Sequence, residues 1–142
     1  MNVNKVVILG GGVLGSQIAY QSAFSGFPTV IYDISDEAVD SAKQKVASYP
    51  KQYQQDINAT DAQIDTANSN LSLTTDLKSA VTGASVIIEA VPERLDIKES
   101  TYKNLAPFIA DDALFLTNSS TLVPSQLIDF VPNKQRFMAM HF

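Results

Sequence analysis

A glycine-rich loop near the start of the chain has residue types and spacing suited to binding a dinucleotide. It matches G-x-G-x-x-G at Gly10, Gly12 and Gly15, and it follows an apolar, β-branched run. Gly10 allows a sharp turn, Gly12 lets the backbone approach a pyrophosphate, and Gly15 lets a helix pack closely on a strand. The positive end of that helix, which begins with Val13 and Leu14, favours a bound diphosphate.

Asp33 lies where the second strand of such a unit ends, about 20 residues after the loop. Its carboxylate can accept hydrogen bonds from both ribose hydroxyls, and its charge would repel a 2′-phosphate. No Arg or Lys occurs between Asp33 and Lys43, so the sequence predicts NAD as the cofactor rather than NADP. The alternative is a glycine turn that only packs a helix on a sheet, with an aspartate that caps a turn.

Composition argues against several classes of protein. The chain has 142 residues, of which 45% are hydrophobic, and this suits one domain with a packed core. A net charge of -5 without a basic run disfavours nucleic acid and an anionic membrane as partners. Without cysteine and with a single His, neither disulfides nor a metal site is expected. The N-terminal apolar run is too short for a signal peptide or a membrane span, so a cytoplasmic protein is expected.

Strand and helix patterns alternate along the chain, which predicts an α/β fold of the Rossmann type. We expect a doubly wound, mostly parallel sheet in the order 3-2-1-4-5-6, with helices on both faces and a helical insertion after the second strand. A helix from Ser35 should end near Ser48, because Pro50 would end or kink it. Thr60 to Gln63 is a possible capping box. The expected strands cover residues 6–9, 29–32, 71–74, 86–91, 114–117 and 136–140.

Polar residues end or follow four of the expected strands. The carboxyl ends of parallel strands meet at one edge, where Rossmann folds bind their ligands, so these residues should line one site. They are Asp33, Glu93, Asn118 and His141. A helix between two of these strands is expected to bury an apolar face formed by residues 97, 101, 105 and 108.

Over its whole length the chain resembles the NAD-binding domain of the L-3-hydroxyacyl-CoA dehydrogenase family. The glycine loop and Asp33 are shared with many proteins, but three later blocks are more specific: Glu89–Lys98, Thr117–Leu122 and Met140–Phe142. The family's polar helical insertion corresponds to residues 36–70. The resemblance implies an NAD-dependent enzyme that interconverts a 3-hydroxyacyl-CoA and a 3-ketoacyl-CoA by hydride transfer.

The resemblance also assigns roles to single residues. His141 corresponds to the catalytic general base, and Ser120 to the serine that hydrogen-bonds the 3-oxygen of the substrate. Glu93 and Lys98 correspond to positions that contact the nicotinamide half of NAD, and Asn118 to a residue beside the nicotinamide and the substrate. Oxidation of a secondary alcohol needs such a base, while the cofactor carries the hydride. The alternatives are a solvated histidine, serines that cap a helix, and surface charges.

One departure from the family pattern concerns the acyl-CoA substrate. The family often contacts the CoA tail through Ser and Lys after the second strand, where this chain has Tyr49–Pro50 and Asp56. Pro50 would break the helix at that contact, and Asp56 has the wrong charge for a phosphate. Carnitine, L-gulonate or a small hydroxy acid therefore remain alternative substrates, and a non-catalytic NAD-sensing module is a third possibility.

The second departure concerns the region after His141. In the family, a carboxylate that orients the histidine lies just beyond this point, and a helical domain follows that completes the substrate cleft and forms a homodimer. We therefore expect residues 1–142 to be an NAD-binding domain without its helical partner. On its own it should bind NAD with little or no turnover.

Overall fold

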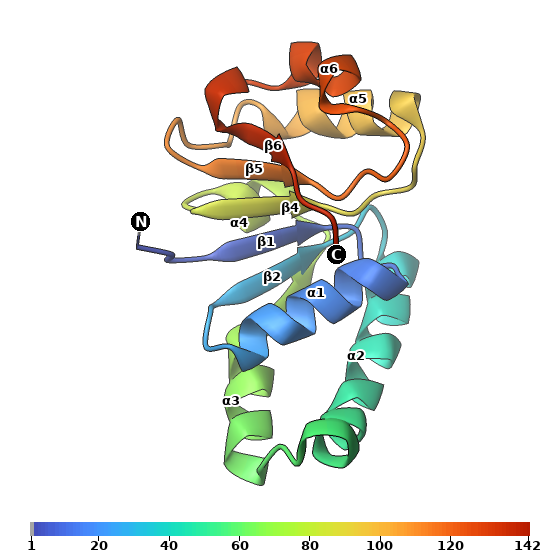
Figure 1. Cartoon of the computed structure of the whole chain (residues 1–142), viewed down its shortest axis with the longest axis vertical. Coiled ribbons are helices and arrows are strands. Elements are labelled where there is room, and N and C mark those ends of the chain that lie inside the picture. The colour runs from blue at the N-terminus through green and yellow to red at the C-terminus, as the bar shows by residue number, and fades with distance from the viewer. Residues whose placement is uncertain (1) are drawn as a thin grey trace.

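The computed structural model describes residues 2–142 as a parallel sheet flanked by helices (Figure 1). The strand order is β3-β2-β1-β4-β5-β6, and all neighbouring strands run parallel. This order confirms the predicted doubly wound α/β fold. The strands are β1 (Val6–Leu9), β2 (Thr29–Tyr32), β3 (Leu71–Thr74), β4 (Val86–Glu89), β5 (Leu114–Thr117) and β6 (Phe137–Ala139).

Helices cover both faces of the sheet (Figure 1). One face carries α1 (Val13–Phe24), α2 (Asp36–Ile57) and α3 (Asp61–Asn70). The other face carries α4 (Leu77–Val81), α5 (Leu95–Leu105) and α6 (Pro124–Leu127), followed by 3₁₀ helices at Ile128–Phe130 and Lys134–Arg136. None of the helices in residues 2–142 combines the length and the apolar character that a bilayer crossing requires.

The two faces of the sheet are both buried. In β1, Val6 and Ile8 belong to the core under α1, while Val7 and Leu9 belong to the core under α4 and α5. Successive strand residues point to opposite faces, so an unbroken apolar run is what a sheet covered on both sides needs. The sheet thus holds its strand ends rigidly at the edge where the predicted polar residues lie.

Side-chain caps start α2, α3 and α4. Ser35 Oγ accepts a hydrogen bond from the backbone N–H of Ala38 (3.2 Å) at the start of α2. Thr60 and Gln63 form the predicted capping box at the start of α3. Asp76 caps α4 in the same way. The sequence predicted the helix start at Ser35 and the capping box at Thr60.

Helix α2 is longer than predicted, and its expected end near Ser48 is wrong. It continues past Pro50 until Asn58, which adopts a left-handed φ of 54°. A proline inside a helix costs about 3 kcal/mol. Tyr49 and Tyr53, on either side of it, pack on Tyr20 of α1 with ring centroids 5.4 and 4.9 Å away. Burial of these rings offsets the cost of the proline.

The buried face of α5 agrees with the prediction at Leu105, while residues 97, 101 and 108 are only partly buried. Its buried residues are Lys98, Tyr102 and Leu105, and the helix ends at Leu105. A lysine is buried here because its ammonium group meets the carboxylate of Glu89 at the end of β4. The apolar periodicity of the sequence could not show this pairing.

Candidate functional site

Two glycines of the loop between β1 and α1 are required by close backbone contacts. Gly10 has a φ of +102°, and a Cβ atom there would lie 2.7 Å from the carbonyl oxygen of Ala90. At Gly15, a Cβ atom would lie only 2.0 Å from the carbonyl oxygen of Gly10. Glycine therefore lets the start of α1 sit directly against the end of β1.

The outer side of the loop is open. A Cβ atom at Gly12 would meet no atom of residues 2–142 within 4 Å. Gly12 precedes α1, whose first turn contains no acidic residue, and the first N–H groups of a helix have no partner within the helix. Val13 and Leu14, which are 65% and 36% exposed, border this opening. The cradle fits the diphosphate of a dinucleotide.

Asp33 is held at the end of β2 by two backbone N–H groups. Its Oδ2 accepts a hydrogen bond from Gly11 (2.7 Å), and its Oδ1 accepts one from Ile34 (2.8 Å). The carboxylate is therefore oriented by the loop itself while each oxygen keeps a further lone pair. This arrangement leaves Asp33 able to accept hydrogen bonds from ribose hydroxyls.

A pocket of about 470 Å³ adjoins Asp33, between the ends of β1 and β2 and helix α5. Val91 and Ile97 contribute apolar walls, and Ser100 and Asn104 contribute polar groups. Its volume is in the usual range for small-molecule sites. An apolar slot with a carboxylate at its edge suits an adenosine group.

A fully buried carboxylate organises the other side of the site. Glu89, the last residue of β4, accepts hydrogen bonds from Lys98 Nζ (2.7 and 2.9 Å), Tyr102 Oη (2.7 Å) and Thr117 Oγ1 (2.8 Å). The backbone N–H of Val91 donates to it as well (3.0 Å). These bonds satisfy a buried ion pair that would otherwise be costly. We call Glu89, Lys98, Tyr102 and Thr117 the Glu89 network.

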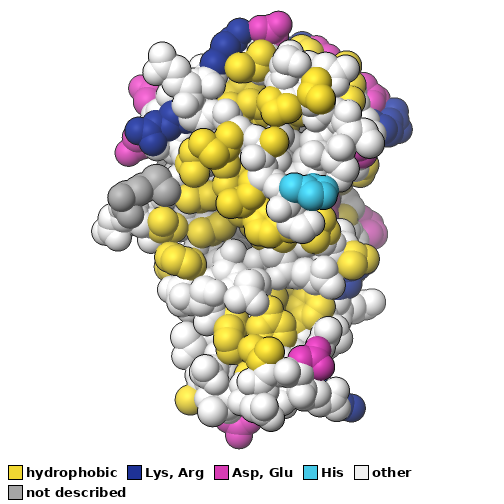
Figure 2. Space-filling model, in the orientation of Figure 1, with side chains coloured by type: hydrophobic (Ala, Val, Ile, Leu, Met, Phe, Trp, Pro, Cys, Tyr) yellow, Lys and Arg dark blue, Asp and Glu magenta, His cyan; other side chains and the backbone are white. Residues whose placement is uncertain are grey.

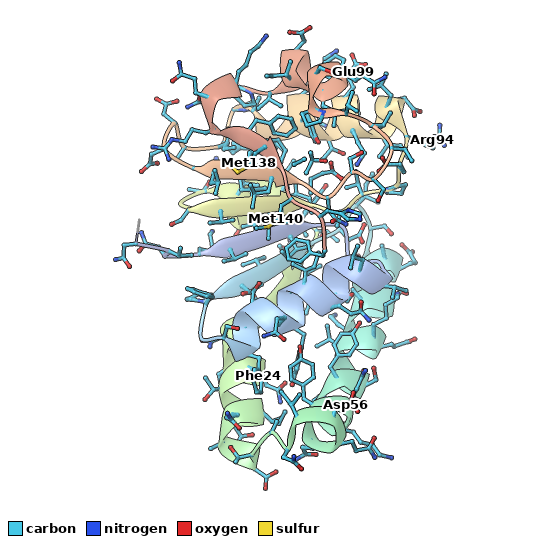
Figure 3. All side chains as sticks on the ribbon, viewed as in Figure 1. Phe24, Asp56, Arg94, Glu99, Met138 and Met140 are labelled. Atoms are coloured by element: carbon cyan, nitrogen blue, oxygen red, sulfur yellow. The ribbon has the colours of Figure 1, made fainter. Side chains whose placement is uncertain are left out.

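Burial raises the pKa of the Tyr102 hydroxyl, and the negative charge of Glu89 raises it further. Tyr102 is thus a fixed donor to the carboxylate. Lys98, with 1% of its side chain exposed, points into the protein, whereas Arg94 at the start of α5 points outward (Figure 3) and pairs with Asp96 at 2.6 Å. Any effect of Lys98 on a cofactor therefore passes through the groups it contacts.

Glu93 links the Glu89 network to the loop after β5. Its Oε2 lies 3.4 Å from Lys98 Nζ, and its Oε1 accepts hydrogen bonds from the backbone N–H groups of Thr121 and Leu122, both 3.0 Å, and from the hydroxyl of Ser119. Partial burial favours the neutral carboxyl, but these hydrogen bonds outweigh it and lower the pKa of Glu93 to about 2. Glu93 is therefore ionised at neutral pH.

Asn118 connects the ends of β5 and β6. Its side-chain Oδ1 accepts a hydrogen bond from the backbone N–H of Phe142 (3.2 Å), and the N–H of Met140 donates to the carbonyl of Thr117 (2.9 Å). His141 is thus flanked by two bonds to neighbouring residues of β5 and its loop. The histidine itself is exposed, and Figure 2 shows it (cyan) beside apolar surface.

The predicted site residues lie at the carboxyl edge of the sheet, except Lys98, which is buried beneath them against Glu89. Those of the glycine loop and Asp33 form one group, and Glu93, Asn118, Ser120 and His141 form a second one around the ends of β4, β5 and β6. Sequence reasoning missed Glu89, Tyr102 and Thr117. One signal was available, because a glutamate inside the apolar run from Val86 to Val91 requires a buried partner.

The sheet order, the glycine cradle and Asp33 define a dinucleotide-binding domain of the Rossmann class. Residues 5–142 match the family model described as 3-hydroxyacyl-CoA dehydrogenase, NAD binding domain. The chain belongs to this family of oxidoreductases, and the cofactor of its domain is NAD.

Known relatives agree with this assignment. The mitochondrial hydroxyacyl-coenzyme A dehydrogenase of Sus scrofa is 29% identical over 147 residues, covering 99% of this chain and 46% of that protein. The α subunit of the fatty acid oxidation complex of Idiomarina loihiensis is 30% identical over 135 residues, covering 95% of this chain and 19% of that protein. The chain therefore spans less than half of either relative.

Solved structures show the same fold. A structure described as "Substrate-directed dual catalysis of dicarbonyl compounds by diketoreductase" matches with a TM-score of 0.95 and 39% identity, covering 100% of this chain and 50% of that one. The (S)-3-hydroxybutyryl-CoA dehydrogenase PaaH1 of Ralstonia eutropha matches with a TM-score of 0.92 and 27% identity, covering 99% of this chain and 50% of that one.

Proposed function

We propose that this domain is the cofactor-binding half of an NAD-dependent dehydrogenase that interconverts a 3-hydroxyacyl-CoA and its 3-keto form. The observation that carries the proposal is the linkage of the His141 segment to the loop of Ser120, through the bond from Phe142 N–H to Asn118 Oδ1. An exposed base and an exposed hydroxyl thereby come from adjacent strand ends, on the side of the sheet that also has the glycine cradle.

Each residue then has a simple task. The hydroxyl of Ser120 donates a hydrogen bond to the substrate's 3-oxygen, and His141 removes the proton from that oxygen as the alcohol becomes a ketone. NAD, when bound, would accept the hydride that leaves the carbon bearing that oxygen. In the reverse direction, His141 returns the proton. The exposed position of both side chains suits contact with a substrate.

The rest of the site would hold the cofactor. Gly10, Gly12 and Gly15, with the N–H groups of Val13 and Leu14, form the diphosphate cradle. Asp33 accepts hydrogen bonds from the ribose hydroxyls and disfavours a 2′-phosphate. Glu93 and Asn118 border the nicotinamide half, with Lys98 acting behind Glu93. The cradle shape and the Asp33 bonds support this assignment.

We further propose that the complete enzyme contains a second, helical segment that closes the substrate cleft and pairs two subunits. The solved relatives are about twice as long as the matched region, since this chain covers 50% of each of the two described above. Without that segment, residues 1–142 should bind NAD and show little turnover.

A second candidate function keeps the chemistry but replaces the acyl-CoA with a smaller carbonyl compound or alcohol. It is favoured by the relative named as a diketoreductase of dicarbonyl compounds, at 39% identity. It is also favoured by Asp56, an exposed carboxylate where the family pattern has a cation for the CoA tail. Carnitine, L-gulonate and small hydroxy acids belong to this candidate.

Steady-state assays of the full-length protein with NAD test these two candidates. The informative pair is 3-hydroxybutyryl-CoA and free 3-hydroxybutyrate, because they differ only in the CoA group. We expect kcat/KM to favour the CoA thioester by at least about tenfold, which corresponds to roughly 1.4 kcal/mol of transition-state binding. Equal or reversed preference, with turnover of a dicarbonyl in the presence of NADH, would support the second candidate instead.

A further inference from the structure

We propose that Thr117, oriented by the buried carboxylate of Glu89, is a positioning residue that fixes the loop Asn118–Leu122 and thereby the hydroxyl of Ser120. This inference rests on the proposed function, because it takes Ser120 as a substrate contact. It assigns a task to residues that lie beneath the site rather than in it.

The first step is the direction of the Thr117 hydroxyl. Its Oγ1 donates to Glu89 Oε2 (2.8 Å) and accepts a hydrogen bond from the backbone N–H of Ser119 (3.2 Å). A hydroxyl has only one hydrogen, and an ionised carboxylate can only accept. The hydroxyl hydrogen is therefore committed to Glu89, which leaves the Oγ1 lone pairs for Ser119. One side of Ser120 is tied to the end of β4 in this way.

The other side of Ser120 is tied to the same carboxylate by a second route. Lys98 Nζ bridges from Glu89 Oε1 (2.7 Å) to Glu93 Oε2 (3.4 Å). Glu93 Oε1 then accepts hydrogen bonds from the backbone N–H groups of Thr121 and Leu122, both 3.0 Å. Ser120 is exposed and lies between these two held segments.

The composition of the network argues for a role beyond stability. A buried ion pair contributes little net stability compared with apolar residues of similar volume. Glu89 and Lys98 are 0% and 1% exposed, and their contacts lead outward to an exposed loop. The Glu89 network can fix the geometry of that loop, because its hydrogen bonds are directional and charge-assisted.

Tyr102 offers a matched control for Thr117. Its hydroxyl donates to the same Oε2 of Glu89 (2.7 Å), but its ring packs in the core against Phe115, with centroids 4.8 Å apart. Thr117→Val and Tyr102→Phe each remove one hydroxyl donor from the same oxygen. Only Thr117→Val also removes the acceptor of the Ser119 N–H.

The test compares Thr117→Val, Thr117→Ser and Tyr102→Phe in the full-length protein. Amide hydrogen exchange at Ser119 should become at least about tenfold faster in Thr117→Val, because its hydrogen bond is lost. It should stay within about twofold of wild type in Tyr102→Phe and in Thr117→Ser, which keeps the hydroxyl. If Thr117→Val does not fold, Thr117→Ala makes the same deletion without added bulk.

Kinetics give the second readout. We expect Thr117→Val to lower kcat by about tenfold, since small displacements of a positioning group are costly in catalysis, while the Kd for NAD changes less than twofold. Thr117→Ser and Tyr102→Phe should keep kcat. Equal exchange at Ser119 in Thr117→Val and Tyr102→Phe, or equal loss of kcat in both, would overturn the inference. If the wild type oxidises none of the alcohols, the proposed function fails, whereas the exchange data still decide whether Thr117 holds the loop.

Discussion

The glycine-loop side of the site and the Glu89 side differ in what they are made of. On the first, backbone atoms of the glycine loop form the cradle for the diphosphate, and the side chain of Asp33 is held by the N–H groups of Gly11 and Ile34. On the second, a buried network of side chains supports an exposed loop and the segment of His141.

This difference corresponds to two tasks: we expect the glycine-loop side to bind the cofactor and the Glu89 side to hold the reactive groups. The glycine cradle has no room for a Cβ atom at Gly10 or Gly15, and its backbone N–H groups are positioned by the start of α1 itself. A reactive serine and histidine can act only if their positions are fixed, and exposed side chains need a second layer of contacts to achieve that. Substitutions on the two sides should therefore affect different measurements.

The largest expected effect belongs to the histidine. His141→Ala should lower turnover of the full-length enzyme by about 10²- to 10⁴-fold, which is the usual contribution of a general base. Its Kd for NAD should be unchanged, because the glycine cradle is untouched. Stopped-flow hydride transfer and a separate NAD titration make the two measurements. Unchanged turnover would remove His141 as the base.

The second prediction distinguishes the role of Gly15 from that of Gly12 in the glycine loop. Gly15→Ala should lower the free energy of unfolding by about 1–3 kcal/mol, the typical cost of overpacking, because the new Cβ would lie 2.0 Å from the Gly10 carbonyl oxygen. NAD binding should weaken with it. Urea unfolding and NAD titration are the measurements.

Gly12→Ala is the matched control for Gly15→Ala. Its Cβ meets no atom of residues 2–142 within 4 Å, so stability should stay within about 0.5 kcal/mol of wild type. NAD should nevertheless bind about tenfold more weakly, since the methyl group occupies the path of the diphosphate. Equal loss of stability in both variants would contradict the distinction drawn between these glycines.

The third prediction concerns the choice of cofactor. Asp33→Asn keeps an oxygen that can accept the Gly11 N–H but removes the negative charge. The preference for NAD over NADP, measured as a ratio of Kd values, should fall by about tenfold, an effect near 1.4 kcal/mol. The unfolding midpoint should change little. A ratio that does not move would mean that shape, rather than the charge of Asp33, excludes the 2′-phosphate.

The smallest effect is expected from the pH dependence of Glu93. Its pKa is about 2 in the folded protein and near 4.5 without these contacts. Between these pH values the unfolded chain binds more protons, so stability should fall as the pH drops from about 4.5 to 2. The effect should be modest because 33% of the Glu93 side chain is exposed.

Urea unfolding of wild type and Glu93→Gln at pH 5 and pH 3 checks this prediction. The stability advantage of wild type should be present at pH 5 and reduced at pH 3, because at pH 3 the unfolded wild type binds a proton at Glu93 that the folded protein does not, whereas the Glu93→Gln variant binds none there in either state. A constant difference between the two proteins would show that Glu93 is not held by hydrogen bonds to its ionised form.

Much of the fold could be predicted because it depends on local rules. The strand order followed from alternating strands and helices, and the helix starts at Ser35 and Thr60 followed from residue type. The end of α2 could not be predicted, because the stabilising contact of Tyr53 with Tyr20 joins residues far apart in the sequence. The roles of His141 and Ser120 stay predictions.

By itself, the sequence identified the residues on the cofactor side of this protein. A glycine has the same conformational freedom in any surroundings, and the position of Asp33 follows from the length of one β-α-β unit. Only the tertiary structure decided the other side. Whether Lys98 reaches a ligand or a buried carboxylate depends on what lies opposite it, and Glu89 and Thr117 come from strands that meet only when the sheet forms. Buried charges must be paired, so the tertiary structure determines which groups pair with Glu89 and Lys98. Those pairs in turn determine how the Ser120 loop is supported.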